Sequence, residues 1–122
     1  MNENKDYITR QTEKGSINIS NDVIAAVAAA AAVEVEGVSG LVSGAGKDIA
    51  QFLGGKKNLG SGVKLNMDGD DLNVDISILL TVGTEINAAA KKIQSSVIDA
   101  VEATTGIKVS AVNVHVSGLS LR

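Results

Sequence analysis

Histidine and cysteine, two of the side chains that catalysis and metal binding use most often, are nearly absent from this chain. His115 is the only histidine, and cysteine is absent, so no thiolate nucleophile and no cysteine-based metal site can form. In an alternating strand whose Val114 and Val116 face the core, His115 faces water. We therefore interpret His115 as an exposed strand residue rather than as a member of a catalytic triad.

The acidic segment Asp68-Gly69-Asp70-Asp71 and two Gly-Lys pairs are the next candidates for ligand binding. A calcium loop that begins at Asn66 needs Gly at its sixth position and Glu at its twelfth, where this chain has Asp71 and Ser77. A phosphate-binding loop needs Ser or Thr after its lysine, which neither Gly46-Lys47 nor Gly55-Lys56 has. We interpret these segments as a turn and as connectors, and we predict no catalytic residue, no cofactor and no metal.

A Gly-x-x-Gly pattern, Gly37-Val-Ser-Gly40, matches the loop that clamps backbone nucleotides in some RNA-binding domains. Glu34 and Glu36 precede it and would repel phosphate. A helix stop followed by a strand start explains the same glycines. An RNA-binding module that uses Gly37–Gly40 is the alternative function for this chain.

The overall composition bounds what the protein can bind and where it can reside. The 122 residues suggest one domain, and the net charge of −3 without a basic stripe argues against a nucleic-acid partner. The longest apolar run, Val23–Val33, is shorter than the roughly 20 residues of a membrane span, and no secretory signal precedes it. We expect a cytoplasmic protein with no direct membrane insertion.

The first half of the chain predicts a tail, a strand, a helix that ends at Gly37, and a second short strand over residues 38–43. Residues 1–14 are polar and predict a disordered N-terminal tail, so that residues 15–122 form the single domain. A short strand over 15–19 leads to Ser20, the predicted N-cap of a helix over 21–34. Five residues at helical spacing form the predicted buried face of this helix: Ile24, Val27, Ala28, Ala31 and Val35. Its outer alanine face either packs within the fold or contacts another subunit.

The second half of the chain contains the strongest pattern, strand–helix–strand. The Gly- and Lys-rich segment Gly44–Gly62 predicts a mobile connection. A hairpin joins the alternating strand Val63–Met67 to the strand 72–82, and one face of this pair is expected to be wet around Asn73 and Asp75. A helix over 85–105, capped by Thr84 and ended by Gly106, leads to a last strand with a bulge near Ser110 and Ala111.

Together these elements predict a two-layer α/β sandwich. The expected element order is β-α-β-β-β-α-β, with a small mixed sheet and two helices on one face. The core must be aliphatic, because Tyr7 and Phe52 are the only aromatic residues. Small side chains bury little area each, so self-association would add stability, and a homo-oligomer is expected.

The order and spacing of several segments resemble the bacterial alkaline shock protein family, also called the general stress or envelope stress response family. The resemblance covers about residues 15–119. It rests on Gly15-Ser-Ile17-Asn-Ile19-Ser20, Val35-Glu-Gly37-Val38, Gly83-Thr-Glu-Ile86, Thr105-Gly106 and Val112-Asn-Val114-His-Val116. This chain departs from the family at Val82 and Glu85, where relatives often have Tyr and Asn.

This resemblance implies a small non-enzymatic protein linked to cell-envelope stress, with no catalytic residues to transfer to this chain. Some members lie at the inner face of the cell membrane. Because this sequence contains no span or lipid anchor, membrane placement implies a membrane-anchored protein partner. The departures at Val82 and Glu85 put in doubt any binding role of the turn between them.

Overall fold

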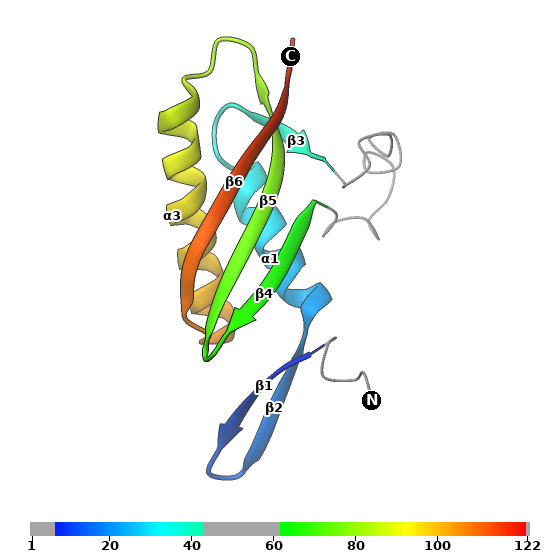
Figure 1. Ribbon diagram of the computed structural model, residues 1–122, viewed down its shortest axis with the longest axis vertical. Coiled ribbons are helices and arrows are strands. Elements are labelled where there is room, and N and C mark those ends of the chain that lie inside the picture. The colour runs from blue at the N-terminus through cyan, green and yellow to red at the C-terminus, as the bar shows by residue number, and fades with distance from the viewer. Residues whose placement is uncertain (1–6, 43–61, 122) are drawn as a thin grey trace.

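The computed structural model describes residues 7–42 and 62–121, which form six strands and two helices (Figure 1). In chain order these elements are β1 (Tyr7–Thr12), β2 (Gly15–Ser20), α1 (Asn21–Val33), β3 (Val38–Leu41), β4 (Val63–Asp68), β5 (Asp71–Thr81), α3 (Ile86–Thr105) and β6 (Val109–Ser120).

Strand β5 is the centre of a mixed four-stranded sheet. On one side it pairs antiparallel with β3 near Leu80 and with β4 from Asp71 to Ile76. On the other side it pairs parallel with β6. The predicted hairpin is present, with Met67 opposite Leu72 and Val63 opposite Ile76. The mixed sheet that the sequence predicts is thus confirmed.

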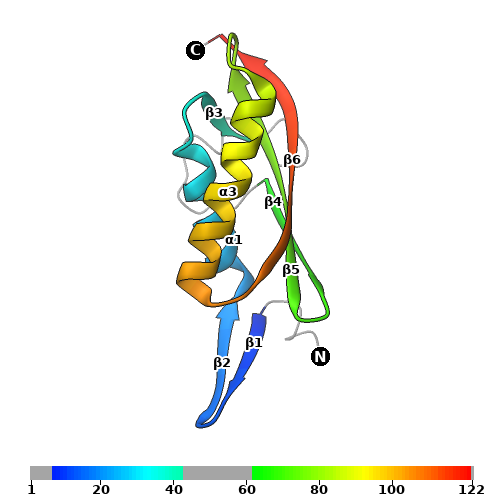
Figure 2. The ribbon, with the colours of Figure 1, turned by 90° about the vertical axis from the view of Figure 1, so that its left-hand side faces the viewer.

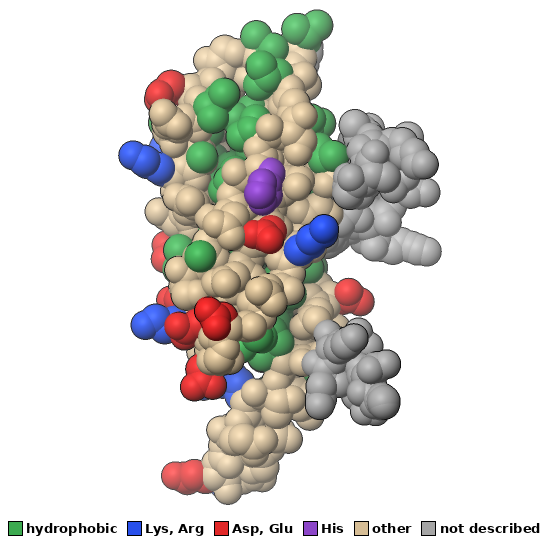
Figure 3. Space-filling view, in the orientation of Figure 1, with side chains coloured by type: hydrophobic (Ala, Val, Ile, Leu, Met, Phe, Trp, Pro, Cys, Tyr) green, Lys and Arg blue, Asp and Glu red, His purple; other side chains and the backbone are tan. Residues whose placement is uncertain are grey.

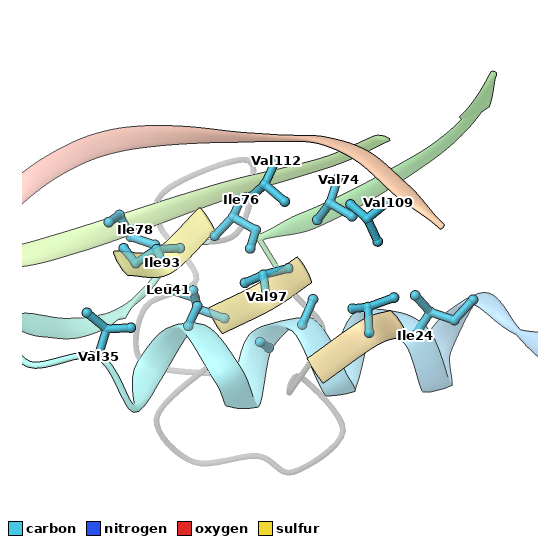
Figure 4. Close-up of a cluster of buried hydrophobic side chains, with 14 of the residues drawn as sticks. Ile24, Val35, Leu41, Val74, Ile76, Ile78, Ile93, Val97, Val109 and Val112 are labelled. Atoms are coloured by element: carbon cyan, nitrogen blue, oxygen red, sulfur yellow. The ribbon is translucent and has the colours of Figure 1, made fainter. Parts of the chain in front are cut away.

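Both helices cover one face of this sheet, as Figure 2 shows. Alternate residues of β5 point toward the helices and are fully buried: Leu72, Val74, Ile76, Ile78 and Leu80. Opposite them, Ile24 of α1 and Ile93 and Val97 of α3 complete an aliphatic core (Figure 4). The two-layer α/β sandwich is confirmed, and its stability comes from the burial of aliphatic side chains.

Helix α1 begins as predicted, but its buried face is wider than predicted. The Ser20 hydroxyl accepts a hydrogen bond of 3.1 Å from the Asp22 amide, which confirms the N-cap. Ala25 and Ala29 are buried, whereas Val27 is only half-buried. The reason is that α1 contacts both the sheet and α3, so its apolar arc must face two neighbours.

Strands β1 and β2 form a separate hairpin that extends away from the sandwich (Figures 1 and 2). The prediction of a disordered tail over residues 1–14 is wrong for 7–12, because these residues pair with β2 from Tyr7–Ser20 to Thr12–Gly15. Ile8 lies opposite Ile19 and is buried. Only one apolar side chain of β1 faces inward, so its composition resembles that of a tail. Strand β2 consequently belongs to this hairpin and not to the main sheet.

Strand β6 carries two irregularities in its pairing with β5. The first skips Ser110, between Val109 and Ala111, and confirms the predicted bulge. It restores the register, so that Val109 and Val112 are both buried. A second irregularity, which the sequence does not predict, skips Ser117.

The connection between β5 and α3 differs in detail from the prediction. Glu85, not Thr84, is the N-cap of α3, and it makes no side-chain capping bond. The Thr84 side chain instead contacts Gly37, where an added Cβ would lie 2.6 Å from Thr84 Cγ2. At its other end α3 stops at Gly106 in the left-handed conformation (φ +77°), as predicted.

Candidate functional site

The face of the sheet that the helices leave open is lined by polar side chains that bond to one another. Asn113 Nδ2 donates to Asp75 Oδ1 at 2.7 Å, and Ser110 Oγ lies 2.6 Å from Asn73 Oδ1. His115 is exposed on this face, opposite Ser77, with an acidic and a basic side chain nearby (Figure 3). The wet face predicted around Asn73, Asp75 and His115 is therefore present.

The chemistry of this open face is that of a bonded surface rather than of a reactive centre. The amide and hydroxyl groups of Asn113 and Ser110 are engaged by neighbours on β5. Within residues 7–42 and 62–121, no three His, Cys, Asp or Glu side chains converge as metal ligands would. The face can present hydrogen-bonding groups to another molecule.

Two shallow grooves lie outside the sheet face. One, of about 450 Å³, is lined by the end of α1 and the outer side of α3: Glu34, Val35, Glu36, Lys91, Lys92, Ser95 and Ser96. The other, of about 590 Å³, separates β1 from the β4–β5 turn and from Gly106–Lys108. Both are open and mix acidic with basic residues, so neither selects a ligand by charge.

Both glycines of the Gly37–Gly40 pattern have a structural role in the fold. Gly37 has φ of +98° and lies against Thr84, and its carbonyl accepts a bond of 2.8 Å from the Thr81 amide. Gly40 is buried in β3, opposite Leu79. The close approach of Thr84 explains the glycine at position 37, and the pairing of β3 with β5 accounts for the burial of Gly40. The other predicted flexible segment, Gly44–Gly62, lies outside the described residues except for Gly62.

The end of the molecule that holds the C-terminus exposes a group of large apolar side chains, which we name the terminal apolar patch: Val82, Ile86, Leu119 and Leu121. Val82 lies beside the last residue of β6, because its amide donates a hydrogen bond to the Ser120 carbonyl at 2.7 Å. Figure 3 shows hydrophobic side chains gathered at this end.

Sequence reasoning missed the terminal apolar patch. The alternation of β5 places Val82 on the inner face, and the helical spacing of α3 does the same for Ile86. Both lie past the point where the other layer covers them, so both are about half exposed. The signal in the sequence that could have revealed the patch is the apolar alternation of the last strand, which continues through Leu119 and Leu121 beyond the part of the strand that the predicted helices cover.

The outer side of α1 is a second apolar surface. Val23 and Val33 are exposed, and Ala30 between them is exposed as well. These three residues follow the helical spacing of one stripe. The prediction that this outer face contacts another subunit stays a prediction. Neither helix in the described part of the chain has the length and apolarity to cross a membrane.

Comparison with known sequences places nearly the whole chain in one family. Residues 9–121 match the profile of the alkaline shock protein family, which is described by a cell envelope-related function. YloU of Bacillus subtilis is 36% identical over 113 residues, which cover 92% of this chain and 94% of YloU. A protein of Streptococcus pyogenes is 34% identical over 111 residues, which cover 90% of this chain and 92% of that protein.

Comparison with solved structures supports the fold. The copper form of the MamM C-terminal domain superposes with a TM-score of 0.50 and covers 83% of this chain and 88% of that domain. The sequence identity is 16%. The likeness therefore extends to the arrangement of helices and strands and to nothing further.

Proposed function

Because this chain belongs to the alkaline shock protein family, whose function is related to the cell envelope, we propose that it is a non-enzymatic structural protein of the bacterial envelope stress response. It works by binding other protein chains. It associates with itself, and a membrane-anchored protein partner recruits it from the cytoplasm to the inner face of the cell membrane.

The observation that carries this proposal is the terminal apolar patch. Isolated exposed apolar residues are normal on protein surfaces, but a group of them at one end of a molecule is typical of a protein–protein interface. Val82, Ile86, Leu119 and Leu121 form such a group, and more than half of the Leu119 surface is exposed. The family description names a cellular structure rather than a reaction, which supports a binding role.

A membrane-binding assay tests the recruitment part of the proposal. Purified protein is sedimented with inverted membrane vesicles from the bacterium that produces it, and with liposomes made from the lipids of those vesicles. We expect binding to the vesicles, loss of that binding after protease treatment of the vesicles, and no binding to the liposomes. Equal binding to vesicles and liposomes would show that the protein binds lipid and not a membrane-anchored protein partner.

Sedimentation velocity tests the self-association part. We expect the wild-type protein to form an oligomer at micromolar concentration. A chain that stays monomeric over the whole concentration range and also fails to bind the vesicles would overturn the proposed function.

A further inference from the structure

The outer edge of β6 carries backbone groups that face away from β5. In a parallel ladder, alternate residues direct both their N–H and their C=O to the same side. Ser120 directs its carbonyl to Val82 of the β5 side, whereas the Val112 carbonyl accepts a bond from α3. It follows that Val114 and Val116 point outward with Val112, and that the irregularity at Ser117 shifts the next outward position to Leu119.

Side chains of α3 cap the first half of this outer edge. Gln94 Nε2 donates to the Val112 carbonyl at 3.0 Å, and Glu102 Oε2 accepts from the Val109 amide at 2.9 Å. These bonds occupy groups that a further strand would otherwise use. The first half of the edge is therefore closed to strand addition by the protein itself.

The second half of the edge, residues 113–121, has no such protection. Within the described part of the chain, no α3 side chain bonds to residues 113–119, and β6 has a paired neighbour only on its β5 side. The segment contains no Lys, Arg, Asp, Glu or Pro, the residues that usually prevent edge pairing. In contrast β4, on the opposite side of the sheet, is short and carries Lys64 and Asp68.

The uncharged sequence of this half of the edge fits a second copy of the chain as its occupant. The net charge is −3, with 14 acidic and 11 basic residues, so two copies carry net charges of the same sign and repel each other. Residues 113–121 contain no Lys, Arg, Asp or Glu, so identical strands can approach there without contacts between such side chains of like charge. A two-fold axis beside Ser117 would place Leu119 of each copy opposite residues 114–115 of the other, and the two terminal apolar patches would lie at opposite ends of the joined strands.

We propose that residues 113–121 of β6 pair antiparallel with the same residues of a second copy, so that two sheets become one continuous sheet. This inference rests on the self-association proposed above and assigns a surface to it. Main-chain hydrogen bonds from Val114, Val116 and Leu119 would hold the pair, and packing of each Leu119 side chain against the partner strand would strengthen it.

A charge substitution at the edge is the first test. Leu119 is 56% exposed and Ile17, on the β1–β2 hairpin, is 52% exposed, so Leu119→Lys and Ile17→Lys remove matched apolar surface from opposite ends of the molecule. We expect Leu119→Lys to raise the dimer dissociation constant by about tenfold or more. We expect Ile17→Lys to leave it unchanged, as measured by sedimentation velocity.

A crosslinking experiment locates the interface without depending on affinity. The chain contains no cysteine, so Ser117→Cys and Ser16→Cys each introduce a single exposed thiol. Under a short bismaleimide crosslinker we expect covalent dimers from Ser117→Cys and none from Ser16→Cys. Circular dichroism of each variant at low concentration checks that it is folded.

Amide hydrogen exchange provides a third measurement, which reports directly on the protection of the backbone amides along the outer edge of β6. The amides of Val114, Val116 and Leu119 should exchange more slowly as protein concentration rises. The Val109 amide, already bonded to Glu102, should be protected at every concentration.

The possible outcomes separate this inference from the proposed function. A wild-type dimer that Leu119→Lys leaves intact and that Ser117→Cys does not crosslink would overturn the β6 interface and keep self-association. Crosslinks from Ser16→Cys, or an open-ended assembly, would overturn the two-fold arrangement. Ser117→Cys that crosslinks to a membrane protein and not to itself would assign the edge to a partner strand. A wild-type chain that is monomeric throughout would overturn this inference and the self-association part of the proposed function, and the vesicle assay would then decide the recruitment part.

Discussion

At the scale of single residues, the polar and glycine positions of this protein serve the fold and its edges. Gly37 provides the space that the Thr84 side chain fills. The helical spacing of α3 predicts that Gln94 and Glu102 lie outside its buried stripe, and in the structure both side chains bond to the backbone of β6. Asn113 and Asp75 bond to each other on the open sheet face. The chemistry of these side chains is therefore used mainly for positioning.

Gly37→Ala should destabilise the protein more than Gly83→Ala. Both glycines have φ of +98°, but an added Cβ meets Thr84 only at Gly37 and meets nothing within 4 Å at Gly83. Backbone strain should cost each variant about 1–3 kcal/mol of unfolding free energy, and the clash should add to this only for Gly37→Ala. Urea denaturation measures both values. Equal losses would show that the contact with Thr84 relaxes freely, and Thr84→Ala should reduce the difference.

At the scale of elements, the β1–β2 hairpin is the least supported part of the described chain. A two-stranded hairpin alone is marginally stable in water, and this one extends beyond the sandwich (Figure 1). Two contacts attach its first strand to the body: Ile8 is buried in the core cluster, and Arg10 Nη1 donates to the Gly106 carbonyl. The second contact places a cation at the C-terminus of α3, where the helix dipole favours it.

Arg10→Ala should loosen the hairpin without unfolding the sandwich. Loss of the bond to Gly106 should cost about 1 kcal/mol, which corresponds to an increase of about fivefold in local opening of β1 and β2. Amide hydrogen exchange measures this opening, and the core amides of β5 should not change. Gln11→Ala, at the exposed neighbouring position, is the control. Unchanged exchange in β1 after Arg10→Ala would show that Ile8 alone holds the hairpin.

At the scale of the whole molecule, stability and assembly are linked. The core is aliphatic and contains several alanines of α1, which bury little area each. Apolar surface remains exposed at the C-terminal end and along α1. Association that buries part of this surface stabilises the native state by mass action.

The melting temperature of the wild-type protein should therefore rise with its concentration. For a dimer, a concentration increase of about 100-fold adds about 2.7 kcal/mol per dimer, which raises Tm by about 5 °C. Differential scanning calorimetry at two concentrations measures the shift. The Tm of Leu119→Lys should rise less with concentration than the Tm of the wild-type protein. A wild-type Tm that is the same at both concentrations would contradict the linkage of folding and association.

The sequence by itself determined most of the elements and their order, because these depend on local signals. The alternation of β5, the helical period of α3, the Ser20 cap and the Gly106 stop each act within a few residues. The bulge near Ser110 also follows from the phase of neighbouring valines. These local signals suffice for the mixed sheet and for the wet face.

Only the tertiary structure decided which surfaces are covered and which stay open. The pairing of β1 with β2, the contact of Thr84 with Gly37 and the capping of β6 by Gln94 depend on segments far apart in the sequence. Val82 and Ile86 continue inward-facing patterns, yet the layers end before they are covered. Periodicity defines the face on which a side chain lies, but burial depends on whether another element reaches that point. For this reason the terminal apolar patch and the open edge of β6 could be found only in the folded molecule.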